Sequence, residues 1–149
     1  VAAGEKDHLP AVLQARGRVH FWKVRRTPGM PVLAGQLDRA QFLGLPGNPV
    51  SVLATWLTLG RVLVDGLKGR APRARQFARL DTSIDKTHAR REFIRGSLHA
   101  GEDGVLQVRP HAATSSHRLR AAAEANALIR LPEQAQRLDA GAAVEVFRK

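Results

Sequence analysis

A strand, a tight turn and the start of a helix follow one another without a gap between residues 41 and 57. A short apolar stretch, residues 42–45, runs into Pro46-Gly47-Asn48-Pro49, and an apolar pattern with helical spacing follows at once. Asparagine is a strong N-cap residue, and proline suits the first helical position because no N–H is needed there. We therefore expect a helix that begins at Pro49 directly after a strand, which limits this half of the chain to an α/β arrangement.

The same junction predicts an anion-binding site. The backbone amides of residues 50–52 would lie in the first helical turn, where N–H groups lack intrahelical partners and attract anions. Ligands of open α/β sheets bind past the carboxyl ends of strands, which is where this turn would lie. Gly47, Asn48, Pro49 and Ser51 are therefore candidate ligand-binding residues. The alternative is a well-capped turn without a ligand, because capping of this kind is common.

The apolar pattern predicts a first unit over residues 1–73, which fits the C-terminal half of a three-layer α/β domain. Its expected elements are a helix at 8–15, strands at 19–24, 32–37 and 41–45, and a long helix at 50–67. Asp38-Arg39 is expected to form the turn between the last two strands. The long helix is expected to bury Leu53, Leu57, Val64 and Leu67, and to end at Gly66 and Gly69.

The second unit is expected over residues 74–149 as a small β-barrel, because several short strands alternate with turn signals. The expected strands are 76–80, 91–98, 105–109, 127–131 and 143–147, with turns at 100–104 and 139–141. The alanine-rich stretch 119–125 is expected to form one or two helical turns.

Composition restricts the function classes. The formal net charge is +11, and arginines spread along the chain carry most of it. Such a field steers phosphates and oxyanions toward a cleft, and it holds nucleic acid only non-specifically because no nucleic-acid motif is present. The absence of cysteine excludes thiolate metal sites, and the six histidines have no metal-ligand spacing. No apolar run approaches the length of a membrane span, and we expect a cytoplasmic protein.

Four segments resemble the signatures of one family, in the same order as in that family. They are Phe21-Trp22-Lys23-Val24 with the following Pro28-Gly29 and Pro31, Gly-Leu-Pro-Gly-Asn-Pro-Val-Ser at 44–51, Arg-Arg-Glu-Phe-Ile-Arg-Gly at 90–96, and Ala-Asn-Ala-Leu-Ile-Arg-Leu-Pro at 125–132. The chain thereby resembles the C-terminal portion of the MoeA/gephyrin family, the molybdopterin molybdenumtransferases. The resemblance implies that the family's preceding domains lie outside this chain.

The resemblance also implies a chemistry. Family members are homodimers that insert molybdate into adenylylated molybdopterin with release of AMP, and they use Mg²⁺ in a cleft between domains. Asp7 takes the place of the family's acidic residue near the metal and phosphates, so it is the candidate metal ligand and catalytic residue. Ser116 takes the place of a serine near the cleft. The alternatives are a helix cap or solvated acid for Asp7 and a simple turn for Ser116. Molybdoenzymes or other proteins of cofactor biosynthesis would be partners.

The chain departs from the family where the pattern Lys-Pro-Gly-Lys-Pro directs two lysines at the anionic substrate. Thr27 and Met30 stand at these two positions. Losing two cations from an oxyanion site would cost on the order of several kcal/mol of transition-state stabilisation. Arg26 is a candidate replacement for the lost charge, although on a straight strand its side chain would face away from the site.

Three hypotheses remain open. The chain is part of an active transferase, or a diverged relative that binds a pterin or nucleotide anion without inserting metal, or a module that serves assembly. The turn at residues 46–49 and the overall resemblance favour the first, and Thr27 and Met30 favour the second. The third would be favoured if neither lysine at positions 27 and 30 nor Asn48→Asp had any effect while self-association persisted.

Overall fold

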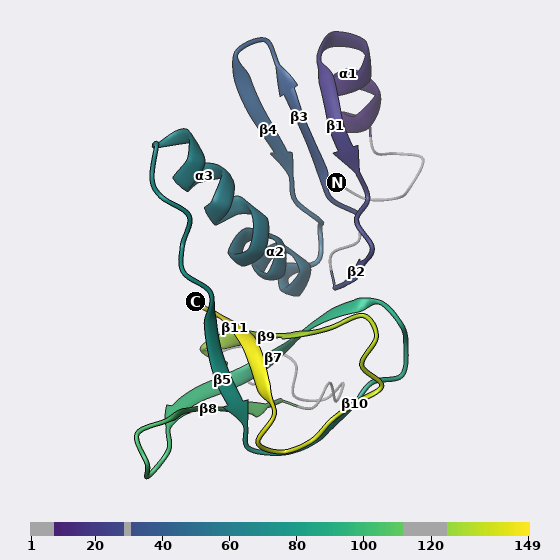
Figure 1. Ribbon diagram of the computed structural model, residues 1–149. Helices are drawn as coiled ribbons and strands as arrows, with labels where there is room; N and C mark the ends of the chain where they lie inside the picture. Colours follow the sequence, from purple (N-terminus) through teal and green to yellow (C-terminus); the bar gives the residue numbers. More distant parts are fainter. Residues whose placement is uncertain (1–7, 29–30, 112–124) are drawn as a thin grey trace. The chain divides into compact units, whose positions relative to one another are not determined.

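The computed structural model describes residues 8–28, 31–111 and 125–149 (Figure 1). The chain divides into two compact units, Val1–Ala71 and Pro72–Lys149. An α/β unit is followed by a small closed β-barrel, so the predicted fold class is confirmed.

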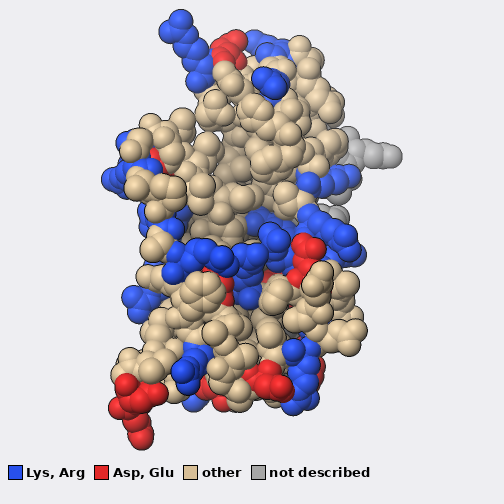
Figure 2. Space-filling view, in the orientation of Figure 1, with Lys and Arg blue, Asp and Glu red and all other residues tan. Residues whose placement is uncertain are grey.

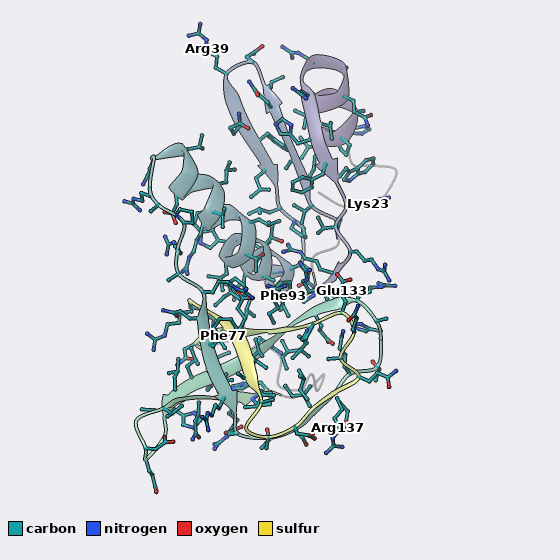
Figure 3. The ribbon with its side chains drawn as sticks, in the orientation of Figure 1. Lys23, Arg39, Phe77, Phe93, Glu133 and Arg137 are labelled. Atoms are coloured by element: carbon teal, nitrogen blue, oxygen red, sulfur yellow. The ribbon has the colours of Figure 1, made fainter. Side chains whose placement is uncertain are left out.

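The first unit contains a three-stranded antiparallel sheet. Its strands are β1 (Arg18–Trp22), β3 (Leu33–Leu37) and β4 (Ala40–Gly44), in the order β1-β3-β4, and the two-residue strand β2 (Arg26–Thr27) lies between β1 and β3 in sequence. The predicted turn at Asp38-Arg39 joins β3 to β4, with Asp38 in a left-handed conformation at φ 53°. Arg39 projects away from this hairpin (Figure 3).

Helix α1 (Leu9–Arg16) packs on this sheet through Leu13, whose side chain is 4% exposed. Leu13 lies against Gly35 of β3, where an added Cβ would come within 2.6 Å of Leu13 Cδ2 and 2.5 Å of the Arg18 carbonyl oxygen. A residue without a side chain is therefore required at this position for the helix to approach the sheet.

The predicted long helix is present but contains a π segment. Helix α2 (Pro49–Thr55) continues through η1 (Trp56–Gly60) into α3 (Arg61–Leu67) without a break. The Trp56 ring lies over Gly60, where an added Cβ would be 2.4 Å from the Trp56 Cε3 atom. Each extra residue in a helical turn rotates the following face by about 100°, so the side chains after residue 60 change direction.

This rotation corrects the predicted buried stripe of the helix. Leu57 is buried as expected, Leu53 and Val64 are half-buried, and Leu67 is 65% exposed. The prediction for Leu67 was wrong because it assumed one uninterrupted 3.6-residue period. Asp65 is buried instead, and its carboxylate is paired with Arg70 at 3.3 Å.

The C-terminal end of the helix is closed by a Schellman motif. The Arg70 N–H donates to the Asp65 carbonyl at 2.9 Å, and the Gly69 N–H donates to the Gly66 carbonyl at 3.0 Å. Gly69 adopts a φ of 64°, a conformation that glycine reaches without a steric penalty. The predicted stop is thus confirmed, with Gly69 as the residue that reverses the chain.

The helix also corrects an expectation about membrane spans. Residues Pro49–Leu67 form one run of 19 residues with a mean hydropathy of 1.4, which is long and apolar enough to cross a membrane by length and composition alone. The core helix of a soluble protein passes the same test. The expectation that no apolar run approaches such a length was therefore wrong. Arg61 and Asp65 are too few charged residues to bring the mean hydropathy of the run below that of a membrane span.

The second unit is a closed five-stranded barrel. Its strands are β5 (Gln76–Leu80), β7 (Arg91–Ala100), β8 (Leu106–Pro110), β9 (Ala127–Leu131) and β11 (Ala143–Arg148). Around the barrel their order is β7-β8-β5-β11-β9, and the antiparallel pairing of β9 with β7 closes the ring. Only the β5–β8 pair among these is parallel. All five strands were predicted, and the stretch 119–125 lies outside the described residues except for its last residue.

Alternate residues of these strands fill the barrel. Val108, Ala127 and Ile129 are fully buried, and Leu80, Val144 and Val146 are nearly so. A small two-stranded ribbon that the sequence did not predict, β6 (Ile84–Asp85) paired with β10 (Arg137–Leu138), lies beside it. Lys86 anchors this ribbon, because its ammonium group donates to the carbonyl oxygens of Pro132 and Glu133.

Candidate functional site

The loop that connects β4 to α2 carries three of the predicted ligand-binding residues at the surface. Pro46 is buried and fixes the base of the loop, whereas Gly47, Asn48 and Pro49 are exposed. No atom lies within 4 Å of a Cβ built on Gly47, so the backbone here is open to an approaching ligand. Pro49 is the first residue of the helix, as the sequence predicts.

The amides of the first helical turn are not open, which corrects the prediction of a bare helix N-terminus. Asn48 Oδ1 accepts hydrogen bonds from the Val50 N–H at 2.9 Å and from the Ser51 N–H at 3.3 Å. The Val52 N–H donates to the Asn48 backbone carbonyl at 2.9 Å. The side chain and the backbone carbonyl of Asn48 therefore together satisfy the three amides that were expected to hold an anion.

Two features of the loop still favour an anion. The positive end of the helix macrodipole remains after capping, because the peptide dipoles are aligned whether or not the first amides are paired. Asn48 uses its Oδ1 atom for the cap, and its Nδ2 amino group has two further N–H donors. Ser51 is 7% exposed and lies behind the loop rather than on it. The binding roles of Gly47, Asn48, Pro49 and Ser51 stay predictions.

Arg26 extends from β2 toward the helix. Its side chain is 6% exposed, its Nη1 donates to Thr58 Oγ1 at 2.6 Å, and its Nη2 donates to Thr55 Oγ1. Burial lowers the pKa of the Arg26 guanidinium to about 10, because an apolar environment disfavours the charged form. Two of its donors are directed at threonines in the second and third turns of the helix, and its proposed role toward a ligand stays a prediction.

The sequence analysis did not predict that Thr55 and Thr58 accept hydrogen bonds from Arg26. Thr55 Oγ1 donates to the Ser51 carbonyl and Thr58 Oγ1 donates to the Ala54 carbonyl, so each hydroxyl is oriented with its lone pairs toward the guanidinium. Serine and threonine commonly bond the carbonyl four residues earlier in a helix. The signal available in the sequence was a pair of threonines three residues apart in an otherwise apolar helix, with an arginine on a nearby strand.

Three predicted positions lie outside the described residues: Asp7, Met30 and Ser116. Thr27 is described and is half-buried at the end of β2. Within residues 8–28, 31–111 and 125–149, no three His, Asp or Glu side chains gather in a way that could hold a metal ion. The predicted Mg²⁺ site, with Asp7 as its ligand, stays a prediction.

Comparison with known families matches both units in turn. Residues 1–65 match the family described as "Probable molybdopterin binding domain", and residues 78–148 match the family described as "MoeA C-terminal region (domain IV)". The two matched regions follow one another along the chain, the first within Val1–Ala71 and the second within Pro72–Lys149. The chain belongs to the MoeA family, and it corresponds to part of the length of a family member.

Proteins with similar sequences are named for molybdopterin chemistry as well. The chain is 35% identical over 149 residues to the molybdopterin molybdenumtransferase of Haemophilus influenzae, covering 98% of this chain and 37% of that protein. It is 33% identical over 131 residues to molybdopterin molybdenumtransferase 2 of Mycobacterium tuberculosis, covering 87% of this chain and 32% of that protein. The chain thus spans about a third of the length of the curated relatives it matches.

Solved structures show the same fold. A crystal structure of the molybdopterin biosynthesis MoeA protein from Pyrococcus horikoshii has a TM-score of 0.76 and 26% identity, covering 93% of this chain and 34% of that one. A molybdenum cofactor biosynthesis protein from Pyrococcus furiosus has a TM-score of 0.63 and 20% identity, covering 89% and 45% respectively. The second likeness is evidence for the fold alone.

Proposed function

We propose that this chain acts in molybdenum cofactor biosynthesis, as part of an enzyme that inserts molybdate into adenylylated molybdopterin and releases AMP. The observation that carries the proposal is the exposed Gly47-Asn48-Pro49 loop at the head of the helix, in a chain whose two units match two consecutive MoeA-family regions. The names of the relatives, molybdopterin molybdenumtransferase and molybdenum cofactor synthesis protein, support the same process.

The loop would hold a phosphate of the substrate. The macrodipole stabilises negative charge in front of Pro49, and the open backbone at Gly47 lets the phosphate oxygens approach closely. Asp7 would be the carboxylate ligand of Mg²⁺, an ion that would neutralise phosphate charge at the site. Arg26 and Ser116 complete the proposed set. The proposal includes a homodimer in the cytoplasm, as the family resemblance implies.

A second candidate follows from the missing lysines. In a diverged relative that binds the anion without inserting metal, Thr27 and Met30 would leave the molybdate without its cations. The geometry of Arg26 favours this candidate, because two of its donors are directed at Thr55 and Thr58. A buried guanidinium held in this way does not move to a new position without losing those bonds.

Release of AMP from adenylylated molybdopterin in the presence of molybdate and Mg²⁺ separates these candidates. The proposal predicts molybdate-dependent release by the unaltered chain. Release that occurs only after Thr27→Lys and Met30→Lys together would support the diverged relative. Circular dichroism checks that the unaltered chain and the double variant are both folded. If neither folded protein releases AMP, the transferase function is contradicted for this chain.

A further inference from the structure

The outer wall of the barrel carries an exposed phenylalanine and two arginines that the proposed function does not use. Phe77 and Arg79 lie on β5, and Arg109 lies on the neighbouring strand β8. Ala78 and Val108, which alternate with them along these strands, belong to the barrel core, so the three side chains lie on the outer face. We call these three residues the β5–β8 surface.

The pairing of the two strands sets the spacing of these side chains. Strands β5 and β8 are parallel, with Arg79 opposite Gln107. Phe77 precedes Arg79 by two residues, a rise of about 6.6 Å along a strand. Arg109 is the diagonal neighbour of Arg79, at about 7–8 Å. Because alternate side chains of an extended peptide are separated by about the same distance, the β5–β8 surface matches positions i, i+2 and i+4 of such a peptide.

Arg109 is oriented by a carboxylate and keeps donors for a ligand. Its Nε atom donates to Asp81 Oδ2 at 2.7 Å, and its side chain is 68% exposed. This bond uses one of the five N–H donors of the guanidinium, and the other four make no hydrogen bond to the described residues. On the β7 side Arg109 lies beside Ser97, whose Oγ atom is 2.7 Å from His111 Nε2. A second carboxylate can therefore bind the two Nη groups of a guanidinium that Asp81 already orients.

Arg79 adds a positive charge without an acidic partner. It is exposed, and it forms no ion pair within the described part of the chain. The β7–β8 turn carries Glu102 and Asp103, and a group of acidic side chains is visible at the lower left of Figure 2, where Figure 1 has this turn. The turn leads into the start of β8, whereas Arg109 lies near the end of that strand. The acidic part of a ligand is thereby directed to the two arginines and away from the turn.

Phe77 offers an apolar contact near the start of β5 (Figure 3). It is 51% exposed. The Arg75 guanidinium lies over the ring, 5.2 Å from its centroid, and is fixed by two hydrogen bonds to Glu145. Nucleic-acid bases bind aromatic side chains by stacking on the ring face, and here one face is already covered. An aliphatic side chain needs only the exposed part of the ring, which favours a peptide over a nucleic acid.

We propose that the β5–β8 surface binds an extended acidic peptide of a partner protein, with an apolar residue at Phe77 and carboxylates at Arg79 and Arg109. The peptide has the pattern apolar-x-acidic-x-acidic, because arginine and carboxylate form charge-assisted and frequently bidentate hydrogen bonds. A nucleic acid carries a charge at every residue, so its phosphates would come close to Asp81 and Glu145. The formal net charge of +11 attracts acidic partners to the chain in general.

Fluorescence anisotropy with labelled peptides tests the proposal on the full chain. The probe has the order leucine-alanine-aspartate-alanine-aspartate between glycine-serine flanks. The control peptide has the same composition in the order leucine-aspartate-aspartate-alanine-alanine, so that its two acids point to opposite sides of an extended chain. We expect the probe to bind about fivefold more tightly than the control peptide, since only one acid of the control can reach an arginine. Equal binding of the two peptides would overturn the proposal.

Variants separate the β5–β8 surface from the general positive charge of the chain. Arg79→Gln and Arg109→Gln are each expected to weaken binding of the probe about fivefold, and Phe77→Ser about threefold. Arg137→Gln removes the same charge from a side chain of β10 that is 60% exposed, and is expected to change binding less than about 1.5-fold. Circular dichroism checks the fold of each variant, and Arg79→Gln removes no ion pair of the described residues. An equal loss in Arg137→Gln and Arg79→Gln would overturn the proposal.

A labelled oligothymidylate distinguishes a peptide from a nucleic acid as the occupant. We expect Arg79→Gln, Arg109→Gln and Arg137→Gln to weaken its binding equally, because diffuse positive charge holds it. A loss of oligothymidylate binding confined to Arg79→Gln and Arg109→Gln would overturn the proposal in favour of a nucleic acid. The β5–β8 surface lies within Pro72–Lys149 and does not rest on the proposed function. Asn48→Asp is expected to leave binding of the probe unchanged while it weakens AMP binding at the loop, so failure of either proposal is visible without the other.

Discussion

The contact between Arg26 and Thr55 predicts a specific pattern of stability in a double-mutant cycle. Thr55→Val keeps the shape of a fully buried side chain but removes the oxygen that accepts from the guanidinium. Because Arg26 is 6% exposed, a donor left without its acceptor there cannot turn to water. An unsatisfied buried donor costs about 1–3 kcal/mol, toward the upper end for a charged group.

The magnitude of the coupling follows from this cost. We expect Thr55→Val to lower the free energy of unfolding by about 2 kcal/mol in the unaltered chain. In the Arg26→Met background no cation needs the hydroxyl, and the same change should cost only about 0.5 kcal/mol for the lost bond to the Ser51 carbonyl. The difference is a coupling energy of about 1.5 kcal/mol.

Urea unfolding followed by tryptophan fluorescence measures these energies for the first unit alone. The chain has two tryptophans, Trp22 and Trp56, and both lie in that unit. A matched cycle with Arg39→Met, an exposed arginine on the β3–β4 turn, should give additive effects within about 0.3 kcal/mol (Figure 3). A coupling of that small size for Arg26 as well would refute the reasoning, since the guanidinium would then not depend on the hydroxyl.

Three further predictions concern the cap, the barrel surface and the barrel core. Asn48→Ala should lower the free energy of unfolding by about 1 kcal/mol, whereas Asn48→Asp keeps an acceptor for the first-turn amides and should cost less, as urea titration of both variants would show. Arg75 and Arg130 hold the pKa of Glu145 below its ordinary value through hydrogen bonds. The carboxylate of Glu145 therefore contributes fully to the free energy of unfolding above the ordinary glutamate pKa. This contribution is lost as the pH falls through the lowered pKa of Glu145. Glu145→Gln should destabilise by about 1 kcal/mol at neutral pH and by nothing in acid, measured by circular dichroism. Gly96→Ala should cost about 1–3 kcal/mol, because its Cβ would come within 2.8 Å of Ile129 Cδ1 and 3.0 Å of the Arg109 carbonyl oxygen, whereas Gly47→Ala should be neutral. An unchanged melting temperature in Gly96→Ala would contradict the close packing.

Much of the fold could be predicted because its signals are local. Strands β5 and β9 have the bounds that the apolar pattern predicts, and the helix begins at Pro49 because Asn48 and Pro49 are strong start signals. The β6–β10 ribbon was missed because strands of two residues have no period to detect. The π segment was missed because the prediction assumed one constant helical period. The Trp56 ring lies over Gly60 in this segment, a contact that spacing alone does not reveal.

The candidate site shows where the reasoning from sequence failed. Asn48 was correctly identified as the cap, yet the amides that a cap occupies were also expected to be open. A cap and an anion would both accept hydrogen bonds from the same amides. The Asn48 side chain already accepts them, so these amides are not open to an anion. The contacts of Arg26 with Thr55 and Thr58 join residues 29 and 32 positions apart, and no local pattern predicts such a pairing. The Ser97–His111 pair arises in the same way from the register of β7 and β8.

Calorimetric titration of this chain with AMP, with and without Mg²⁺ and molybdate, tests the central claim most directly. The account predicts that AMP binds, that Mg²⁺ strengthens the binding, and that Asn48→Asp weakens it by placing a negative charge beside the phosphate. Gly47→Ala, which keeps the helix cap, should weaken it by a smaller factor. AMP binding that is the same in Asn48→Asp as in the unaltered chain, or absent under every combination, would contradict the claim that this loop holds the anionic substrate.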